Sequence, residues 1–342
     1  MIREAISKIV DRQDLSEADM ILVMNEIMSG EATPAQIGSF ITALRMKGET
    51  IDEIVGAVKV MREKATRIDT GIDTAAGEVL VDIVGTGGDG SGSFNVSTTT
   101  SFVVAAAGVP VAKHGNRAVS SHCGAADVIE ALGVNLGLSP ERVGASVREV
   151  GIGFLFAPMM HGAMKYAIGP RSEIGIRTLF NILGPMTNPA GANVQLTGVF
   201  APELTTVLAE VLVRLGMQRA IIVWGEGNLD EMTVTGATHI ADGHDGQVTT
   251  SIITPEQVGL KTAPFATIRG GRTAAAAAEQ VRAVLGGEPG PKLDMVLLNA
   301  GTTLMAAGLV PDIRAGIDRA RETVRSGAAL AKLDQLIAFC RG

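Results

Sequence analysis

Cysteine and basic charge are both scarce in this sequence of 342 residues. The two cysteines, Cys123 and Cys340, provide neither a disulfide framework nor the ligand pattern of a zinc site. The formal net charge is -7, whereas a protein that binds nucleic acid through its phosphates usually has a basic face and a basic pI. The composition therefore argues against a disulfide scaffold and against nucleic acid as a partner, and it fits a reducing cytoplasm.

Aromatic residues and long uninterrupted apolar runs are lacking as well. Aromatics make up 3% of a chain that is 46% hydrophobic, so the core has to be built from aliphatic residues, methionine and alanine. Charges interrupt every long apolar run, and the first residues, MIRE, do not form an apolar signal region. We therefore expect a cytoplasmic protein with no membrane partner, long enough for one large domain and a smaller one.

The first 69 residues carry repeated helix-start signals. Ser16, Thr33 and Thr50 are each followed three residues later by Asp, Gln or Glu, as in a capping box, and an apolar pattern of helical period comes next. Pro34 occupies the first helical position after Thr33, where proline is well tolerated. These signals predict several short helices and no strand, that is, a small N-terminal α-helical domain over residues 1–69.

Residues 70–342 alternate between short apolar runs and helical patterns, which is typical of βαβ units. Helices are expected at 97–107, 125–132 and 205–215, and strands at 79–84, 108–112, 196–199, 220–223 and 295–298. The predicted fold class is therefore α/β: a small N-terminal α-helical domain and a larger α/β domain with a mostly parallel central sheet.

A glycine-rich loop, GTGGDGSGSFNVST (residues 85–98), lies between the first strand and the next helix. Backbone N–H groups, a helix N-terminus and hydroxyls converge in such a loop and suit phosphate or diphosphate. It contains GxGxxG, but Lys113 follows the second strand where a dinucleotide site needs an acid. The P-loop pattern fails because Ser91 stands in place of lysine. A glycine-rich turn without a ligand is the simpler alternative.

A second polar loop, KHGNRAVSS (residues 113–121), follows the second strand. The carboxyl ends of parallel strands share one edge of a sheet, so both loops are expected at the same place. A lysine, an asparagine and two serines there could complete a site for several phosphates. The alternatives are a solvated strand end for Lys113 and a structural salt bridge for Arg117.

Further motifs follow in order: FLFAPMMHGAMKY (154–166), RSEIGIRTLFNILGPMTNPA (171–190) and GNLDEMT (227–233), with IMSGEATPAQIGSFITALRMKGET (27–50) before them. Together with the two loops, they closely resemble the anthranilate phosphoribosyltransferases over nearly the whole chain. The resemblance implies transfer of the phosphoribosyl group of 5-phosphoribosyl 1-diphosphate to the amine of anthranilate. The products would be N-(5-phosphoribosyl)anthranilate, an intermediate of tryptophan biosynthesis, and diphosphate.

The resemblance also implies a binding site for phosphoribosyl diphosphate. Its residues would be Gly85, Gly88, Asp89, Ser93, Asn95, Val96, Ser97, Thr98, Lys113, His114, Gly115, Asn116, Arg117, Ala118, Val119, Ser120 and Ser121. Two Mg²⁺ ions per subunit are expected, with Ser97, Asp230 and Glu231 as metal ligands, because adjacent acids on a loop can share a hard cation. The alternative for the Asp-Glu pair is a solvated acidic turn.

For anthranilate, the resemblance points to Gly85, Asn116, His161, Tyr166 and Arg171. A guanidinium presents a fork of donors that matches a carboxylate, so Arg171 is expected to face the anthranilate carboxylate. No catalytic base is nominated, because an aromatic amine is already nucleophilic. Positioning and stabilisation of the leaving diphosphate would carry the catalysis.

Family members usually form homodimers through the helical domain, and a segment at about 167–190 is expected to complete that domain. Ala125 and Ser172 depart from the usual pattern, where a serine and a second arginine are common. A pyrimidine nucleoside phosphorylase is the alternative enzyme, which would use inorganic phosphate and would not need Asp230 and Glu231 as a metal pair. A nucleic-acid-binding paralogue is the non-enzyme alternative, against which the net charge of -7 and the presence of Asn116 and Arg171 argue.

Overall fold

The structure is a computed structural model that describes residues 1–117 and 123–342. It divides into two compact units, which are described separately. The helical unit consists of Met1–Arg67 and Pro158–Pro189, and the α/β unit consists of Ile68–Ala157 and Ala190–Gly342. The chain thus returns to the helical unit earlier than the expected residue 167. No helix in the described part of the chain is long and apolar enough to cross a membrane.

The helical unit contains α1 (Ile2–Val10), α2 (Glu17–Ser29), α3 (Pro34–Lys47) and α4 (Ile51–Lys64), with α8 (Ala157–Met160), α9 (Lys165–Ile174) and α10 (Phe180–Leu183) in the returning segment. The predicted N-caps are confirmed. The Ser16 hydroxyl accepts a hydrogen bond from the backbone N–H of Asp19, and capping boxes begin α3 at Thr33 and α4 at Thr50. Each cap satisfies N–H groups that the first helical turn leaves without partners.

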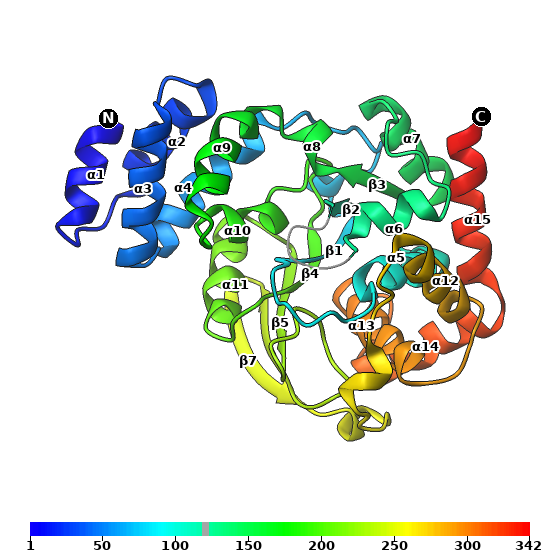
Figure 1. Ribbon diagram of the computed structural model, residues 1–342. Helices are drawn as coiled ribbons and strands as arrows, with labels where there is room; N and C mark the ends of the chain where they lie inside the picture. The colour runs from blue at the N-terminus through cyan, green and yellow to red at the C-terminus, as the bar shows by residue number, and fades with distance from the viewer. Residues whose placement is uncertain (118–122) are drawn as a thin grey trace. The chain divides into compact units, whose positions relative to one another are not determined.

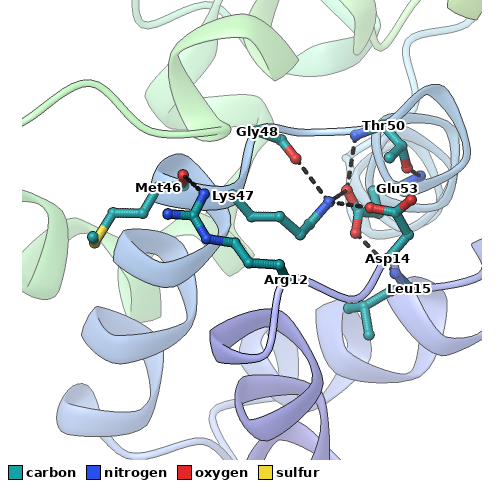
Figure 2. A network of polar contacts seen from close by, with 8 residues as sticks. All are labelled: Arg12, Asp14, Leu15, Met46, Lys47, Gly48, Thr50 and Glu53. Atoms are coloured by element: carbon teal, nitrogen blue, oxygen red, sulfur yellow. Dashed lines mark hydrogen bonds and ion pairs between the residues drawn. The ribbon is translucent and has the colours of Figure 1, made fainter.

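A buried ion pair joins two connections of the helical unit, as Figure 2 shows. Lys47 Nζ lies 3.0 Å from Glu53 Oε2 and 2.7 Å from Asp14 Oδ1. The carboxylate of Glu53, which has no exposed surface, also accepts hydrogen bonds from the backbone N–H groups of Leu15 and Thr50. The charges therefore hold the α1–α2 connection against the α3–α4 connection, and the acceptor oxygens of Glu53 are all engaged.

The α/β unit contains a seven-stranded sheet in the order β3-β2-β1-β4-β5-β6-β7 (Figure 1). Its strands are β1 (Val81–Gly85), β2 (Val111–Gly115), β3 (Ile152–Phe156), β4 (Val194–Gly198), β5 (Arg219–Gly225), β6 (Thr238–His244) and β7 (Gln247–Ile253). The pairs from β3 to β5 are parallel, and β6 and β7 add an antiparallel hairpin. The predicted mostly parallel sheet is confirmed.

The chain order across this sheet reverses between β1 and β4. From β1 the chain moves outward through β2 to β3, and β4 then pairs with the other side of β1. Gly85 at the end of β1 is in register with Gly198 at the end of β4. In open α/β sheets, ligands bind outside the carboxyl ends of the strands at such a reversal. The glycine-rich loop follows β1 at this point.

The helices of the α/β unit are α5 (Val96–Ala106), α6 (Ala125–Ala131), α7 (Pro140–Val150), α11 (Leu204–Arg214), α12 (Ala274–Leu285), α13 (Pro291–Ala306), α14 (Ile313–Arg325) and α15 (Ala328–Arg341). Helix α5 packs on β1 and β2, α13 on β4, α7 on β3, and α11 on β5 and the hairpin. The buried core is mostly aliphatic, as the low aromatic content predicts.

The strand predicted at 295–298 is wrong, because these residues lie within helix α13. Pro291 opens this helix at a position that proline favours, and most of the residues from Met295 to Ala306 are buried. A helix that is buried on nearly all sides loses its amphipathic period, so a short apolar run cannot be distinguished from a buried strand.

Other elements are shifted or were missed. Strand β2 begins at Val111 rather than at 108, because Gly108 has a left-handed φ of 102° and Pro110 cannot donate to the ladder. Lys113 therefore lies inside the strand rather than after it. Strand β3 and the β6–β7 hairpin were not predicted, although Asp245 and Gly246, both with positive φ, are a strong hairpin signal.

Candidate functional site

The glycine-rich loop connects Gly85, the last residue of β1, to the N-terminus of α5. Four of its glycines, Gly87, Gly88, Gly90 and Gly92, have φ between 67° and 72°, a region that other residues enter only with strain. The N-cap residue of α5, Asn95, makes no side-chain cap bond, and the first turn itself contains no acidic residue. The positive end of this helix therefore faces the loop, which is the arrangement that favours an anion.

Two acidic side chains lie directly against this loop. Asp230 and Glu231 belong to the connection between β5 and β6, far from the loop in sequence. The backbone N–H of Gly87 donates to Asp230 Oδ2 at 2.7 Å, and that of Ser97 donates to Glu231 Oε1 at 3.1 Å. The structure thus brings together the glycine loop, the N-terminus of α5 and the acidic pair that the sequence assigned to metal.

Two glycines make room for this acidic loop. A Cβ on Gly85 would lie 2.3 Å from Asp230 Oδ2, and a Cβ on Gly198 would lie 1.5 Å from the Asp230 carbonyl oxygen. Any side chain at Gly198 would therefore displace the backbone of Asp230. The close approach of the acidic loop to β1 and β4 depends on glycine at both strand ends.

Lys113 is the cation of the site. Its side chain is buried in β2, and Nζ donates to the carbonyl oxygen of Ile83 at 2.6 Å and to Ser97 Oγ at 3.3 Å. Burial lowers the pKa of Lys113, and the nearby charges of Asp82, Glu231 and Asp230 oppose that effect. Lys113 is therefore buried, and the alternative interpretation of this residue as a solvated strand end is wrong.

The electrostatic environment of the acidic pair is unfavourable without a further cation. Burial raises the pKa of Asp230, and the charge of Asp89 raises it further. Burial also raises the pKa of Glu231, the charge of Asp230 adds to this, and Lys113 only partly offsets it. Three carboxylates close to one buried ammonium leave negative charge that a bound divalent cation would neutralise.

The donor set fits Mg²⁺. The carboxylates of Asp230 and Glu231 and the hydroxyl of Ser97 are hard oxygen donors, and the backbone bonds to the two carboxylates leave further lone pairs for coordination. Among the described residues, no three His, Cys, Asp or Glu side chains form a metal cage. This agrees with Mg²⁺ chemistry, in which one or two carboxylates are usually completed by substrate phosphates and water.

The remaining loop residues surround the same point. Asn95 Nδ2 donates to the carbonyl oxygen of Cys123 at 3.2 Å, and Ser93 pairs with Arg269 in an isolated bridge. The hydroxyl of Ser91 donates to the Asp89 carboxylate. Thr98 is buried, and among the described residues its Oγ1 has no hydrogen-bond partner. An unpartnered buried hydroxyl is unusual and is consistent with a missing polar ligand.

The second loop is only partly described. The backbone N–H of His114 donates to Asp82 Oδ1 at 3.1 Å, which holds the start of the loop to β1. The guanidinium of Arg117 pairs with Asp127 and Glu130 of α6 at 3.0 and 2.9 Å. The side chain of Arg117 therefore forms the structural salt bridge that was the alternative to a phosphate contact. Gly115 and Asn116 begin the loop, and the predicted residues Ala118, Val119, Ser120 and Ser121 lie outside the described residues.

The other residues predicted for anthranilate lie in the helical unit. Arg171 of α9 stacks its guanidinium on Phe180 at 5.2 Å, and burial lowers its pKa. His161 is buried, which lowers its pKa to about 4, so the ring is neutral at physiological pH. Tyr166 is 37% exposed, and its ring fills the space beside Gly30, where a Cβ would approach to 2.5 Å.

Two contributors to the site were missed from sequence. Asp82, a charged residue within the apolar run of β1, could have been noticed because an acid in a buried strand needs partners. Gly198 carries no local signal, because its role depends on Asp230, which approaches it from another part of the chain.

Two family models match the chain. Residues 77–330 match the model described as "Glycosyl transferase family, a/b domain", and residues 3–65 match "Glycosyl transferase family, helical bundle domain". The fold and the anion loop thus define a glycosyltransferase of this class.

Individual relatives identify the family within this class of glycosyltransferases. The chain is 67% identical to the anthranilate phosphoribosyltransferase of Desulfotalea psychrophila, over 99% of this chain and 97% of that one. It resembles the crystal structure of the Thermus thermophilus enzyme with a TM-score of 0.92 and 43% identity, over 99% of both chains. The Saccharomyces cerevisiae enzyme in complex with PRPP and Mg matches with a TM-score of 0.85 and 28% identity, over 99% and 98% of the chains. The chain belongs to the anthranilate phosphoribosyltransferase family.

Proposed function

We propose that this protein transfers the phosphoribosyl group of 5-phosphoribosyl 1-diphosphate to the amine of anthranilate. The products are N-(5-phosphoribosyl)anthranilate and diphosphate, in a step of tryptophan biosynthesis. The observation that carries the proposal is the acidic pair hydrogen-bonded to the glycine loop and to the N-terminus of α5. This arrangement suits a leaving group that is both multiply charged and bound to metal. The relatives named above share this activity by name.

In the α/β unit, we propose that the glycine loop and the N-terminus of α5 bind the diphosphate and ribose. Gly85, Gly88 and Asp89 begin the loop, and Asn95 to Thr98 form the first turn of α5. Lys113 supplies the fixed positive charge and, through Ser97, is joined to that turn. The loop from His114 to Ser121 completes the phosphate contacts, with Arg117 contributing through its backbone because α6 engages its guanidinium.

We assign Ser97, Asp230 and Glu231 as ligands for two Mg²⁺ ions per subunit. The bound metal supplies charge neutralisation for the departing diphosphate. The N–H groups of Gly87 and Ser97 hold the two carboxylates in place, and the remaining lone pairs of these carboxylates would coordinate the metal. The yeast relative has been solved with PRPP and Mg, which supports use of this metal.

For the acceptor, we propose that Gly85, Asn116, His161, Tyr166 and Arg171 bind anthranilate. The Arg171 guanidinium is held on the face of Phe180, so its donor fork is preorganised for a carboxylate. Neutral His161 avoids placing a second positive charge near the amine that attacks. No residue is assigned as a general base. Another structure of the yeast enzyme contains 4-fluoroanthranilate, which supports an aromatic acceptor.

We also propose a homodimer that assembles through the helical unit, and a cytoplasmic location. The family resemblance supports the dimer. The two free cysteines, Cys123 and Cys340, fit a reducing compartment. Sedimentation of the purified protein at micromolar concentration tests the dimer, which a monomer mass would contradict.

One assay tests the activity itself. The protein is mixed with phosphoribosyl diphosphate, Mg²⁺ and anthranilate, and the loss of anthranilate fluorescence is followed. We expect a loss that requires all components and that stops when EDTA removes the metal. Unchanged fluorescence at high enzyme concentration would contradict the proposal, and phosphorolysis of thymidine in its place would indicate the nucleoside phosphorylase alternative.

A further inference from the structure

A buried amide on α13 holds the backbone next to the acidic pair. Asn299 has no exposed surface, and its Nδ2 donates to the carbonyl oxygen of Met232 at 2.9 Å while its Oδ1 accepts from the N–H of Met232 at 3.2 Å. Nδ2 also donates to the carbonyl oxygen of Met295, one turn earlier in the same helix. One side chain thus satisfies both backbone polar groups of the residue that follows Glu231.

This contact is one of three that hold consecutive residues of the loop. The loop is held to the glycine loop at Asp230, to the first turn of α5 at Glu231, and to α13 at Met232. Gly198 removes the Cβ that would otherwise displace the Asp230 carbonyl. Three consecutive residues are therefore fixed by three different elements. Asp230 and Glu231 are held through their carboxylates, whereas Asn299 holds the backbone of Met232.

We propose that Asn299 is a positioning residue for phosphoribosyl transfer, acting on Asp230 and Glu231 through Met232. It does not touch substrate or metal in this assignment. It fixes the backbone from which the two carboxylates project, so that their free oxygens stay where the metal-bound diphosphate needs them. The inference rests on the proposed function, because it takes the two acids to be metal ligands.

The expected size of the effect follows from the energetics of such supports. Replacing Asn299 leaves at least one backbone group of Met232 without a partner in a buried place. The loop can then shift by a small distance to find other partners, which moves the carboxylates. Changes in the residues that orient metal ligands typically cost about 10–100-fold in metal affinity or activity.

Asn193 provides a matched control in the same unit. It is also a largely buried asparagine that accepts from one backbone N–H, of Leu80 at 2.9 Å, and donates to one carbonyl oxygen, of Glu78 at 2.8 Å. It precedes β4, at the amino edge of the sheet, whereas the site lies at the carboxyl edge. Replacing it removes the same kind of backbone support without touching the acidic loop.

The experiment measures the gain in affinity for phosphoribosyl diphosphate that Mg²⁺ provides. Calorimetry gives the Kd with excess Mg²⁺ and with EDTA, and the ratio of the two is the metal-linked gain. The variants are Asn299→Asp, which keeps the acceptor and loses the amide donors, and Asn299→Ser, in case the first does not fold. Asn193→Asp is the control, and thermal melting of each variant reports folding.

We expect the Asn299 variants to reduce the metal-linked gain by about 10-fold or more. Like the Asn299 variants, the Asn193→Asp control should melt at a lower temperature than the wild type. Unlike them, it should keep the wild-type gain in affinity with Mg²⁺. Folded Asn299→Asp and Asn299→Ser proteins with the wild-type gain would overturn the inference.

The double variant Asp230→Asn with Glu231→Gln separates this inference from the proposed function. If that variant loses the gain while both Asn299 variants keep it, the positioning role alone is wrong. If the double variant also keeps the gain, the metal assignment is wrong and Asn299 has nothing to position. Wild-type protein that binds no phosphoribosyl diphosphate would contradict the proposed function.

Discussion

The molecule contains two buried groups of charges that differ in how completely they are satisfied. In the helical unit, the carboxylate of Glu53 accepts from Lys47 and from two backbone N–H groups. In the α/β unit, Asp230 and Glu231 accept backbone hydrogen bonds, and Asp230 also bonds with another acid, Asp89. The nearby ammonium, that of Lys113, bonds to other groups.

The pKa shifts follow this difference. Burial lowers the pKa of Lys47, but its bonds to Asp14 and Glu53 outweigh burial and raise it, so the cation is stabilised in place. For Lys113, the effect of burial exceeds that of the nearby carboxylates, so its pKa is lowered. The pKa values of Asp230 and Glu231 are raised. A satisfied group of buried charges serves the fold, whereas an unsatisfied one at the end of a sheet marks a place for a charged ligand.

The largest effect is expected for the unsatisfied group. Asp230→Asn with Glu231→Gln should lower kcat/KM by on the order of 10³-fold, because the leaving diphosphate loses its metal. The thermal midpoint without ligand should stay the same or rise, because two buried like charges are removed. Steady-state kinetics and thermal melting measure the two effects. If the double variant loses stability and keeps its activity, the acidic pair serves the fold rather than the reaction, which would contradict the comparison.

The satisfied group should respond in the opposite way. Glu53→Gln removes the charge that Lys47 faces and should lower the free energy of unfolding by about 3 kcal/mol, within the range for broken buried pairs. Urea denaturation measures this loss. The kcat/KM per folded molecule should stay unchanged, and a large fall in it with unchanged stability would contradict the structural role.

Lys113→Met tests the cation of the site. A methionine fills similar space but cannot donate to Ser97 or attract phosphate. The KM for phosphoribosyl diphosphate should rise by about 10–100-fold, as expected for the loss of a charged hydrogen bond of about 1.5–3 kcal/mol. The KM for anthranilate serves as the internal control. Equal increases in both would indicate a general disturbance of the fold rather than a phosphate contact.

The smallest effects concern helix caps remote from either charge group. Thr33→Ala removes the side-chain cap of α3 and should lower the free energy of unfolding by about 1 kcal/mol. Thr33→Ser keeps the acceptor and should stay close to wild type. Urea denaturation compares the two. An alanine variant as stable as the serine variant would show that this cap contributes nothing.

Much of the fold could be predicted because its signals are local. Ser16, Thr33 and Thr50 cap helices with bonds that span three residues, so the sequence alone locates those helix starts. The run that ends at Gly85 likewise identified a strand, and the glycines after it identified the loop for which an anion site is proposed. Short-range patterns of this kind depend on neighbours along the chain, so they can be recognised without knowledge of the tertiary structure.

The one strand that was wrongly predicted lies where burial replaced local pattern. The apolar run at 295–298 resembles a strand because α13 is buried on nearly all sides. That error also hid Asn299, one residue further on, whose partner Met232 is 67 residues away in sequence. A side chain that acts across such a distance leaves no spacing to recognise.

The sequence by itself determined the chemistry of this protein: a loop able to bind an anion, a lysine, an acidic pair, and an order of motifs that identifies the family. The tertiary structure decided which of these groups meet and in what state. It buried Lys113, brought Asp230 Oδ2 to within 2.7 Å of the Gly87 nitrogen, left no room for a Cβ at residue 198, and bonded the Asn299 amide to the backbone beside the acidic pair. The physical reason is that desolvation and close packing depend on segments remote in the chain, whereas capping and turn preferences depend on adjacent residues.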